Sequence, residues 1–245
     1  MIDIENLKSI PISTSGYKLL KEGIVQDMVV VKPSARIHIE NVYDKASLKG
    51  TNRNVYLRLN VLQKLEKILD QLPDKFSITI FDGFRSLETQ KAIFNEFFEK
   101  ILAEGGLTKE QAYQKTLAFV PYPGEAGCYE VMPHNSGGAV DLSLLYEGVP
   151  LDMGTGFDDT SDLAKTSFFE SKFNDRYEIS QKRWTEIRSY RRLLFNLMIE
   201  QGFTNHPLEW WHYNFGNHPW AGDLKTNPVY DSAEDRALKI NSSLS

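Results

Sequence analysis

The sequence contains a single cysteine, no long apolar run and no cluster of basic residues. One cysteine, Cys128, excludes an intramolecular disulfide and is typical of proteins from reducing compartments. Because no stretch approaches the roughly 20 apolar residues that a membrane-spanning helix needs, we expect no transmembrane helix. The net charge is -5, from 28 basic and 33 acidic residues, and the basic residues form no continuous block. We therefore expect no nucleic-acid partner.

The composition is close to that of an average globular protein. Hydrophobic residues make up 41% and charged residues 25% of the 245 positions, and a chain of this length can bury one large core. We expect one domain over residues 1–220, followed by a polar and loosely held C-terminal extension over 221–245. The start of the chain has two acidic residues among its first ten and no apolar run typical of a secretory signal. We therefore expect a cytoplasmic protein that does not associate with a membrane.

Apolar periodicity predicts helices and strands around the polar motifs. Between Tyr56 and Leu72 apolar residues recur at helical spacing, and Pro73 follows. Phe76 to Ile80 alternates with polar residues and predicts a strand that runs into Arg85. Further helices are expected from Ser86 to before Gly105, from the capping-box pattern at Thr108 to about Phe119, and over residues 181–201.

Two further expectations concern the C-terminal half. The face of the helix at 181–201 that we expect to be exposed carries four arginines, Arg183, Arg188, Arg191 and Arg192. The aromatic stretch 208–215 is expected to form a strand. In an ideal strand residues 209 and 212 point to opposite faces, so the chain must bend between them if both serve one site.

Two short motifs combine side chains suited to a catalytic metal. His134-Asn-Ser-Gly-Gly-Ala-Val-Asp141 is followed along the chain by Glu209-Trp-Trp-His212. A catalytic zinc commonly takes three protein nitrogen or oxygen ligands and keeps a fourth position for water. His134, Asp141 and His212 supply such a set, and Glu209 is a spare carboxylate that can take a proton from the water. The sequence predicts one Zn2+ per chain at these three residues.

These motifs resemble those of a known family. The segment 134–141 resembles the Ser-x-His-x-x-Gly-x-Ala-x-Asp motif of the zinc D,D-peptidases related to Hedgehog domains. Glu209-Trp-Trp-His-Tyr213 is similar to the D-alanyl-D-alanine dipeptidases, the VanX-like enzymes of vancomycin resistance. Phe81-Asp-Gly-Phe-Arg85 and Met153-Gly-Thr-Gly-Phe-Asp158 are similar to two further family segments, and the matches occur in order over about residues 36–215.

The resemblance implies a fold and an activity. It implies a single α+β domain of the Hedgehog/D,D-peptidase type, with a central antiparallel sheet flanked by helices. It implies a zinc metallopeptidase that hydrolyses the free dipeptide D-alanyl-D-alanine, a component of peptidoglycan precursors, or a close D,D-dipeptide. Glu209 would then act as general base, Arg85 would stabilise the transition state, and Asp158 would receive the substrate's free ammonium group.

The sequence departs from the family pattern at two positions. The serine two positions before the first histidine is replaced by Met132, and the proline that usually follows the arginine is replaced by Ser86. A thioether is a weak hydrogen-bond acceptor and no donor. The substrate pocket is therefore expected to differ at Met132.

Other interpretations remain open. A D,D-carboxypeptidase or L,D-endopeptidase acting on peptidoglycan stem peptides would use the same chemistry. Such relatives tend to carry Glu-Pro-Trp-His at the second motif, so Trp210 favours the dipeptidase, as does the absence of an apolar leader. A non-catalytic zinc domain is disfavoured because Glu209 and Arg85 accompany the three ligands. His38, His206 and His218 are expected to be structural or exposed, with His218 the main competitor of His212 as a ligand. The sequence specifies no oligomeric state.

Overall fold

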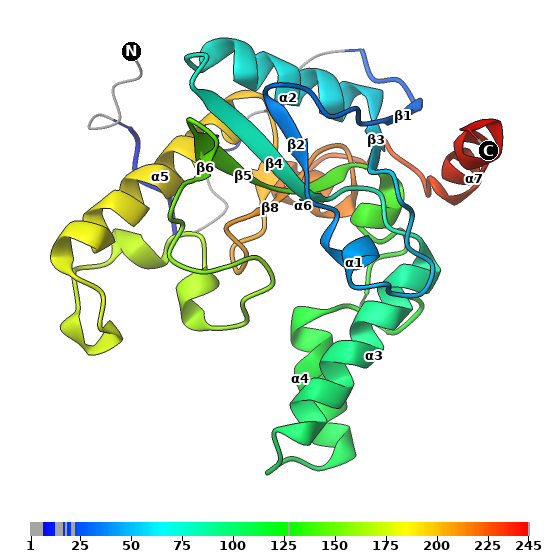
Figure 1. Ribbon diagram of the computed structural model, residues 1–245. Coiled ribbons are helices and arrows are strands. Elements are labelled where there is room, and N and C mark those ends of the chain that lie inside the picture. The colour runs from blue at the N-terminus through cyan, green and yellow to red at the C-terminus, as the bar shows by residue number, and fades with distance from the viewer. Residues whose placement is uncertain (1–6, 13–16, 18, 21–22, 127, 245) are drawn as a thin grey trace.

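The computed structural model describes residues 7–244 except 13–16, 18, 21–22 and 127 (Figure 1). Residues 1–6, on which the expectation of a missing export signal partly rests, lie outside the described residues. In the described part of the chain no helix combines the length and apolar character that crossing a membrane requires.

A six-stranded sheet lies at the centre of the fold, with strand order β2-β4-β5-β8-β7 and β6 paired to β5. Its strands are β2 (Ile37–Ile39), β4 (Phe76–Asp82), β5 (Ala139–Tyr146), β6 (Val149–Pro150), β7 (Thr204–Asn205) and β8 (His212–Asn214). A separate two-stranded sheet pairs β1 (Met28–Val30) with β3 (Tyr56–Arg58). The expected α+β class is confirmed, with one departure: β2 pairs with β4 in parallel, whereas the other pairings are antiparallel.

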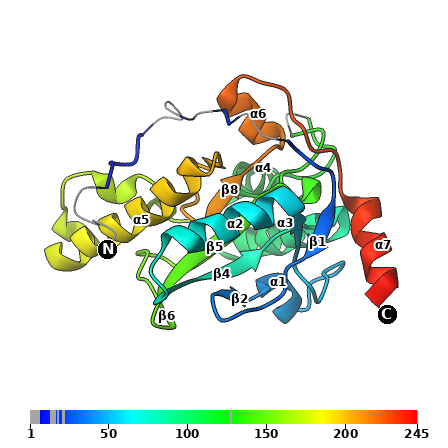
Figure 2. The same ribbon diagram turned by 90° about the horizontal axis from the view of Figure 1, so that it is seen from above.

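Helices flank the central sheet (Figures 1 and 2). They are α1 (Val42–Lys45), α2 (Leu59–Gln71), α3 (Leu87–Ala103), α4 (Lys109–Phe119), α5 (Gln181–Glu200), α6 (His218–Leu224) and α7 (Glu234–Leu244). Short 3-10 turns are η2 (His134–Ser136), η3 (Asp162–Ala164), η4 (Phe168–Glu170) and η5 (Asp175–Tyr177). Helices α3 and α4 form a hairpin that projects away from the sheet (Figure 1).

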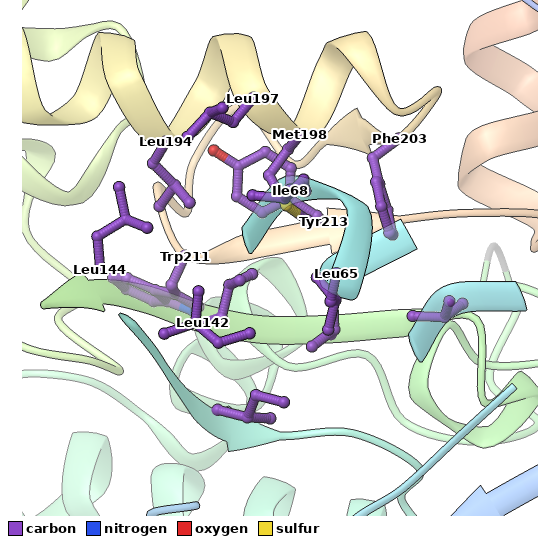
Figure 3. Packing of buried hydrophobic residues seen from close by; sticks show 14 of the residues in the cluster. Leu65, Ile68, Leu142, Leu144, Leu194, Leu197, Met198, Phe203, Trp211 and Tyr213 are labelled. Carbon is purple, nitrogen blue, oxygen red and sulfur yellow. The ribbon is translucent and has the colours of Figure 1, made fainter. Parts of the chain in front are cut away.

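The main core lies between the sheet and the helices α2 and α5 (Figure 3). Leu65 and Ile68 of α2 and Leu194 and Met198 of α5 pack in one cluster with side chains of β5 and β8. Leu142 of β5 is fully buried. Burying an aliphatic side chain of this size stabilises the folded state by about 1.5–3 kcal/mol. This packing fixes the positions of the strands β4, β5 and β8, which carry polar side chains near their ends.

The strand register brings distant polar residues into one row. Asp82 of β4 pairs with Asp141 of β5, and Asp141 pairs with His212 of β8. A register shift between Ile80 and Asp82 marks a bulge in β4 next to this row. Bulges of this kind redirect a side chain at the end of a ladder.

Most of the elements predicted from periodicity are present. The helices α3, α4 and α5 and the strand β4 occur where the sequence predicts them, whereas α2 begins only at Leu59, since Tyr56–Arg58 form β3. The Ser86 side chain caps α3 by accepting a hydrogen bond from the Thr89 amide, and Thr108 and Gln111 form the expected capping box. His38 lies on the exposed side of β2, as expected.

Three expectations about the C-terminal half are wrong. Arg191 is 2% exposed and does not belong to the solvent-facing side of α5. Residues 208–215 form a strand only at His212–Asn214, because the chain before it turns.

The third concerns the segment after residue 220, which is not loosely held. Tyr230, Ala233 and Ala237 are buried. The Ser232 hydroxyl donates to the Asn135 side chain, and the Ala233 amide donates to the Asn135 carbonyl. This segment therefore packs on the loop that carries His134. The division into 1–220 and 221–245 remains a prediction.

The close packing of Gly138 generates a stability prediction. A Cβ at this position would meet the Phe215 carbonyl oxygen and would lie 2.9 Å from the Tyr230 ring. Overpacking a rigid site costs about 1–3 kcal/mol, so Gly138→Ala should lower the free energy of unfolding by that amount. Guanidinium titration followed by circular dichroism measures it. Gly156→Ala is the control, since its Cβ would meet nothing within 4 Å, and equal stability losses in both variants would contradict the packing argument.

Candidate metal centre and substrate cavity

His134, Asp141 and His212 converge at one end of the central sheet. Their candidate ligand atoms all lie within 4.8 Å of one another, and their side chains are only 6%, 3% and 8% exposed. His134 Nε2 lies 3.3 Å from Asp141 Oδ2 and 3.2 Å from His212 Nδ1, and His212 Nδ1 lies 2.9 Å from Asp141 Oδ1. The structure therefore brings together the three side chains that the sequence predicts as ligands.

Hydrogen bonds on the outer side of each imidazole fix which nitrogen carries the proton. His134 Nδ1 lies 2.7 Å from the Gly83 carbonyl oxygen, which can only accept. His212 Nε2 lies 3.1 Å from Asn214 Oδ1, which also accepts from the Asn217 amide. If each ring carries one proton, its unprotonated nitrogen, His134 Nε2 or His212 Nδ1, therefore faces the other ring and Asp141.

This arrangement suits a cation. Asp141 Oδ1 is buried and has no hydrogen-bond partner, so three atoms with lone pairs face one another without a donor between them. Protons on the histidines would satisfy the same lone pairs: burial opposes ionisation of Asp141, but charge on His134 and His212 would lower its pKa. Tetrahedral zinc with ligands at about 2.0–2.1 Å places them roughly 3.3 Å apart, close to the three distances found here. The residues therefore fit a Zn2+ ion, with a carbonyl and an amide orienting the two histidines.

Glu209 lies beside this cluster because the chain turns between the two positions. The His212 amide donates to the Glu209 carbonyl and the Glu209 amide donates to the His206 carbonyl, which closes two consecutive turns. The bend that a shared site requires is therefore present. Glu209 Oε2 lies 3.8 Å from His212 Nδ1, and its side chain is 27% exposed, so this carboxylate is in contact with both the cluster and solvent.

Arg85 is the buried cation of the site. Its Nε and Nη2 donate to Asp82 Oδ2 at 2.9 and 2.7 Å, and its Nη1 donates to Gln90 Oε1 at 2.8 Å. Nη2 also lies 3.9 Å from Asp141 Oδ2. Burial disfavours its charge, but the nearby negative charge of Asp82 outweighs it and holds the pKa of Arg85 above the ordinary value. A charged donor is thus fixed next to the candidate ligands.

Asp158 faces the same cavity from the loop after β6. Its two carboxylate oxygens accept from the Tyr43 hydroxyl at 3.2 and 2.9 Å, and its backbone has a left-handed φ of 59°. Burial raises the pKa of Asp158 to about 7; Arg85 lowers it and Asp141 raises it further. A buried carboxylate with one neutral partner is suited to accept a cationic group from a ligand.

A cavity of about 400 Å³ joins these groups. Its polar lining includes His134, Asp141, Asp158, Glu209 and His212, and its apolar lining includes Ile93, Phe97, Val120 and Met132. Met132 is 3% exposed, so the residue that replaces the family serine forms part of the cavity wall.

The other candidate residues lie outside the cluster. His206 lines the cavity, with its ring centroid 5.8 Å from that of His212. His38 of β2 forms a hydrogen bond with Ser77 of β4, and His218 is the first residue of α6. Cys128 is a free, partly buried thiol and does not belong to the metal-type cluster.

Some residues that contact the candidate site residues have no recognisable signal in the sequence. Tyr43 lies in a four-residue helix far from any motif, and only the tertiary structure brings its hydroxyl to Asp158. Asn214 lies two residues after a predicted ligand, but no pattern distinguishes it from an ordinary strand asparagine. Asp82 belongs to the segment Phe81-Asp-Gly-Phe-Arg85, but the sequence does not show that its carboxylate pairs with Arg85.

A buried His-Asp-His set beside a free carboxylate, an arginine and an open cavity is the arrangement of a metal-dependent hydrolase. The family model of the peptidases described as D-ala-D-ala dipeptidase matches residues 51–231. The chain belongs to this family of metallopeptidases.

Three individual proteins to which the chain is similar can be named. A D-alanyl-D-alanine dipeptidase of Synechocystis sp. is 28% identical over 210 residues, which cover 78% of this chain and 84% of the relative. Among solved structures, the D,D-pentapeptidase VanY of a VanB-type vancomycin resistance cassette, in complex with Zn(II), is 21% identical, with coverages of 69% and 77% and a TM-score of 0.42. The LD-carboxypeptidase LdcB is 16% identical, with coverages of 90% and 75% and a TM-score of 0.43.

The hydrogen bond from His212 to Asn214 generates a prediction about metal affinity. Asn214→Leu removes the acceptor that keeps His212 Nδ1 unprotonated, and losing such a partner typically weakens metal binding about 10–100-fold. Competition with a chromogenic chelator measures the dissociation constant for Zn2+. Asn196→Leu is a control on the surface side of α5, and an unchanged affinity in Asn214→Leu would show that the bond does not orient the ligand.

Proposed function

We propose that this metallopeptidase hydrolyses D-alanyl-D-alanine or a close D,D-dipeptide, with one Zn2+ per chain held by His134, Asp141 and His212. The observation that carries the proposal is the position of Asp158. A buried carboxylate in the same cavity as the metal-type cluster can bind the ammonium group of a substrate whose scissile bond lies one residue away. The relative from Synechocystis carries this activity in its name.

The bound metal would supply a water of lowered pKa and would polarise the scissile carbonyl. Glu209 would take the proton of the attacking water and deliver it to the leaving amine. Its position supports this role, because the carboxylate lies 3.8 Å from His212 and is 27% exposed, so it can reach both the metal-type cluster and a water molecule.

Arg85 would donate to the oxygen that becomes negative in the transition state. Asp82 accepts from Nε and Nη2, and Gln90 accepts from Nη1. Nη2 also lies 3.4 Å from the Tyr43 hydroxyl and 3.9 Å from Asp141 Oδ2, next to the cavity. A donor that is already fixed costs no reorganisation during the reaction.

Asp158 would select for a free amino terminus. An N-acylated dipeptide or a longer peptide presents a neutral amide in place of the ammonium group. The buried carboxylate of Asp158 would then have no positive charge beside it from the substrate. Truncating one member of a buried charge pair costs about 2–5 kcal/mol. The preference for dipeptides would therefore follow from electrostatics. The cytoplasmic location expected from the sequence remains a prediction.

The decisive experiment compares three substrates with the same scissile bond. Free D-Ala-D-Ala, N-acetyl-D-Ala-D-Ala and a pentapeptide ending in D-Ala-D-Ala are incubated with the protein, with and without a chelator and with Zn2+ added back. A much higher kcat/KM for the free dipeptide than for the other two substrates, with activity lost on chelation and restored by zinc, is the expected result. Preference for the pentapeptide would indicate a carboxypeptidase, and cleavage of none would contradict the proposed activity.

Glu209 and Arg85 generate a prediction about rate. Glu209→Gln removes the base and should lower kcat about 10²–10⁴-fold. Arg85→Ala should lower kcat about 10²–10³-fold, which corresponds to about 2.7–4 kcal/mol of transition-state stabilisation. Steady-state kinetics with metal content measured in parallel separates lost chemistry from lost metal. Full turnover in either variant would remove the role assigned to that residue.

Asp158 generates a prediction about pH. Its pKa is raised to about 7, and only the ionised form binds an ammonium group. The value of kcat/KM for the free dipeptide should therefore fall as the pH drops through this pKa, which a bound zinc cation would move downward. Asp158→Asn should raise KM at least about 30-fold, equivalent to about 2 kcal/mol. Asp159→Asn, at a neighbouring position of the cavity wall, is the matched control. A similar KM in the two variants would exclude Asp158 as the ammonium acceptor.

A further inference from the structure

Arg191 is a buried cation on α5 that lies outside the metal-type cluster. Its side chain donates to three backbone carbonyl groups: Nε to Met153 at 2.8 Å, Nη2 to Leu163 at 2.8 Å and Nη1 to Lys165 at 2.7 Å. Its guanidinium also lies over the Phe169 ring, 4.8 Å from the centroid. No carboxylate among the described residues pairs with it within 4.0 Å.

Burying this charge has a cost. Removing an ion from water costs several kcal/mol unless polar groups replace the lost hydration. Burial lowers the pKa of Arg191 to about 9, so the guanidinium is still protonated at neutral pH. The three carbonyl oxygens replace water as acceptors. These three contacts fix the backbone that carries them relative to α5.

The three carbonyl groups belong to the two ends of one loop. Residues 153–165 connect β6 to η4 with no regular structure except the turn η3. Asp158 lies near the middle of this loop, and its backbone has a left-handed conformation, which aspartate tolerates better than most residues. Arg191 therefore fastens both ends of the loop whose centre carries Asp158.

The same loop is attached to the turn that carries Glu209. The Trp210 indole N–H donates to the Thr155 hydroxyl at 2.8 Å, and the Trp210 amide donates to the Ala164 carbonyl at 3.1 Å. The Arg191 guanidinium lies 5.9 Å from the centroid of the Trp210 ring. Arg191, Trp210 and the loop thus form one packed unit that joins Asp158 to Glu209.

We propose that Arg191 is a positioning residue that sets the requirement for a free amino terminus. By fixing both ends of the 153–165 loop it holds Asp158 at a constant distance from Glu209, so that a substrate bound by its ammonium group presents the correct peptide bond. This inference rests on the proposed dipeptidase activity. It adds a residue that contacts neither the substrate nor the metal.

The test measures specificity, because an arginine that only stabilises the fold would lower all activities in proportion. The ratio of kcat/KM for D-Ala-D-Ala to kcat/KM for N-acetyl-D-Ala-D-Ala is determined for the full-length zinc-loaded protein and for Arg191→Met and Arg191→Lys. We expect the ratio to fall at least about tenfold in both variants, because neither replacement can donate to three carbonyl groups in a plane. The loss should appear mainly as a higher KM for the free dipeptide.

Two further variants make the result decisive. Arg188→Met is the matched control, since Arg188 donates to the carbonyl groups of Phe169 and Ser171 from the same helix but does not contact the loop. Its ratio should match that of the wild type. Thr155→Val removes the loop hydroxyl that accepts from the Trp210 indole. It should lower the ratio of the two kcat/KM values, and it keeps the test available if the Arg191 variants fold poorly.

Hydrogen exchange monitored by mass spectrometry supplies a readout independent of substrate. Amides of residues 153–165 should exchange faster in Arg191→Met than in the wild type, with no change in β4 or β5. An unchanged ratio in Arg191→Met and Thr155→Val, or unchanged loop exchange in Arg191→Met, would overturn the inference. Failure of the wild type to cleave either substrate would instead remove the dipeptidase proposal on which it rests.

Discussion

The site depends on the register of three neighbouring strands. Asp82, Asp141 and His212 occupy paired positions of β4, β5 and β8, so a shift of one residue in either pairing would turn one of these side chains to the opposite face. The apolar cluster formed with α2 and α5 fixes this register from one side of the sheet. Hydrophobic packing elsewhere on the sheet therefore positions Asp82, Asp141 and His212. Attraction between these side chains is not required to bring them together.

Charge at the site is unbalanced, and the imbalance explains what the site accepts. Asp82, Asp141, Asp158 and Glu209 contribute carboxylates, whereas Arg85 is the cation bonded to one of them and close to another. Asp82 balances Arg85, which leaves Asp141 facing two unprotonated nitrogens and Asp158 facing a neutral hydroxyl. The proposed metal cation and ammonium group would fill these two roles. One excess of negative charge would thus account for both kinds of partner.

The candidate ligands could be proposed from the sequence because their signals are short: a histidine and an aspartate separated by small residues, and a glutamate three positions before a histidine. The helices α2 to α5 follow from periodicity and caps in the same way. Tyr43, Asn214 and Arg191 could not be recognised, because each acts through a partner brought near by the tertiary fold. Arginines spaced along a polar helix give no sign that one of them points inward.

The contacts between the C-terminal segment and Asn135 have a consequence for biosynthesis. Asn135 directly follows His134, and the hydroxyl that bonds its side chain belongs to Ser232, 97 positions later in the chain. A ribosome must therefore add most of the second half of the protein before the loop around His134 receives its final contacts. During that interval the nascent chain already contains His134 and Asp141 but not the residues that bond to Asn135. Completion of the loop around His134 is thus a late event, which follows synthesis of all the strands of the central sheet.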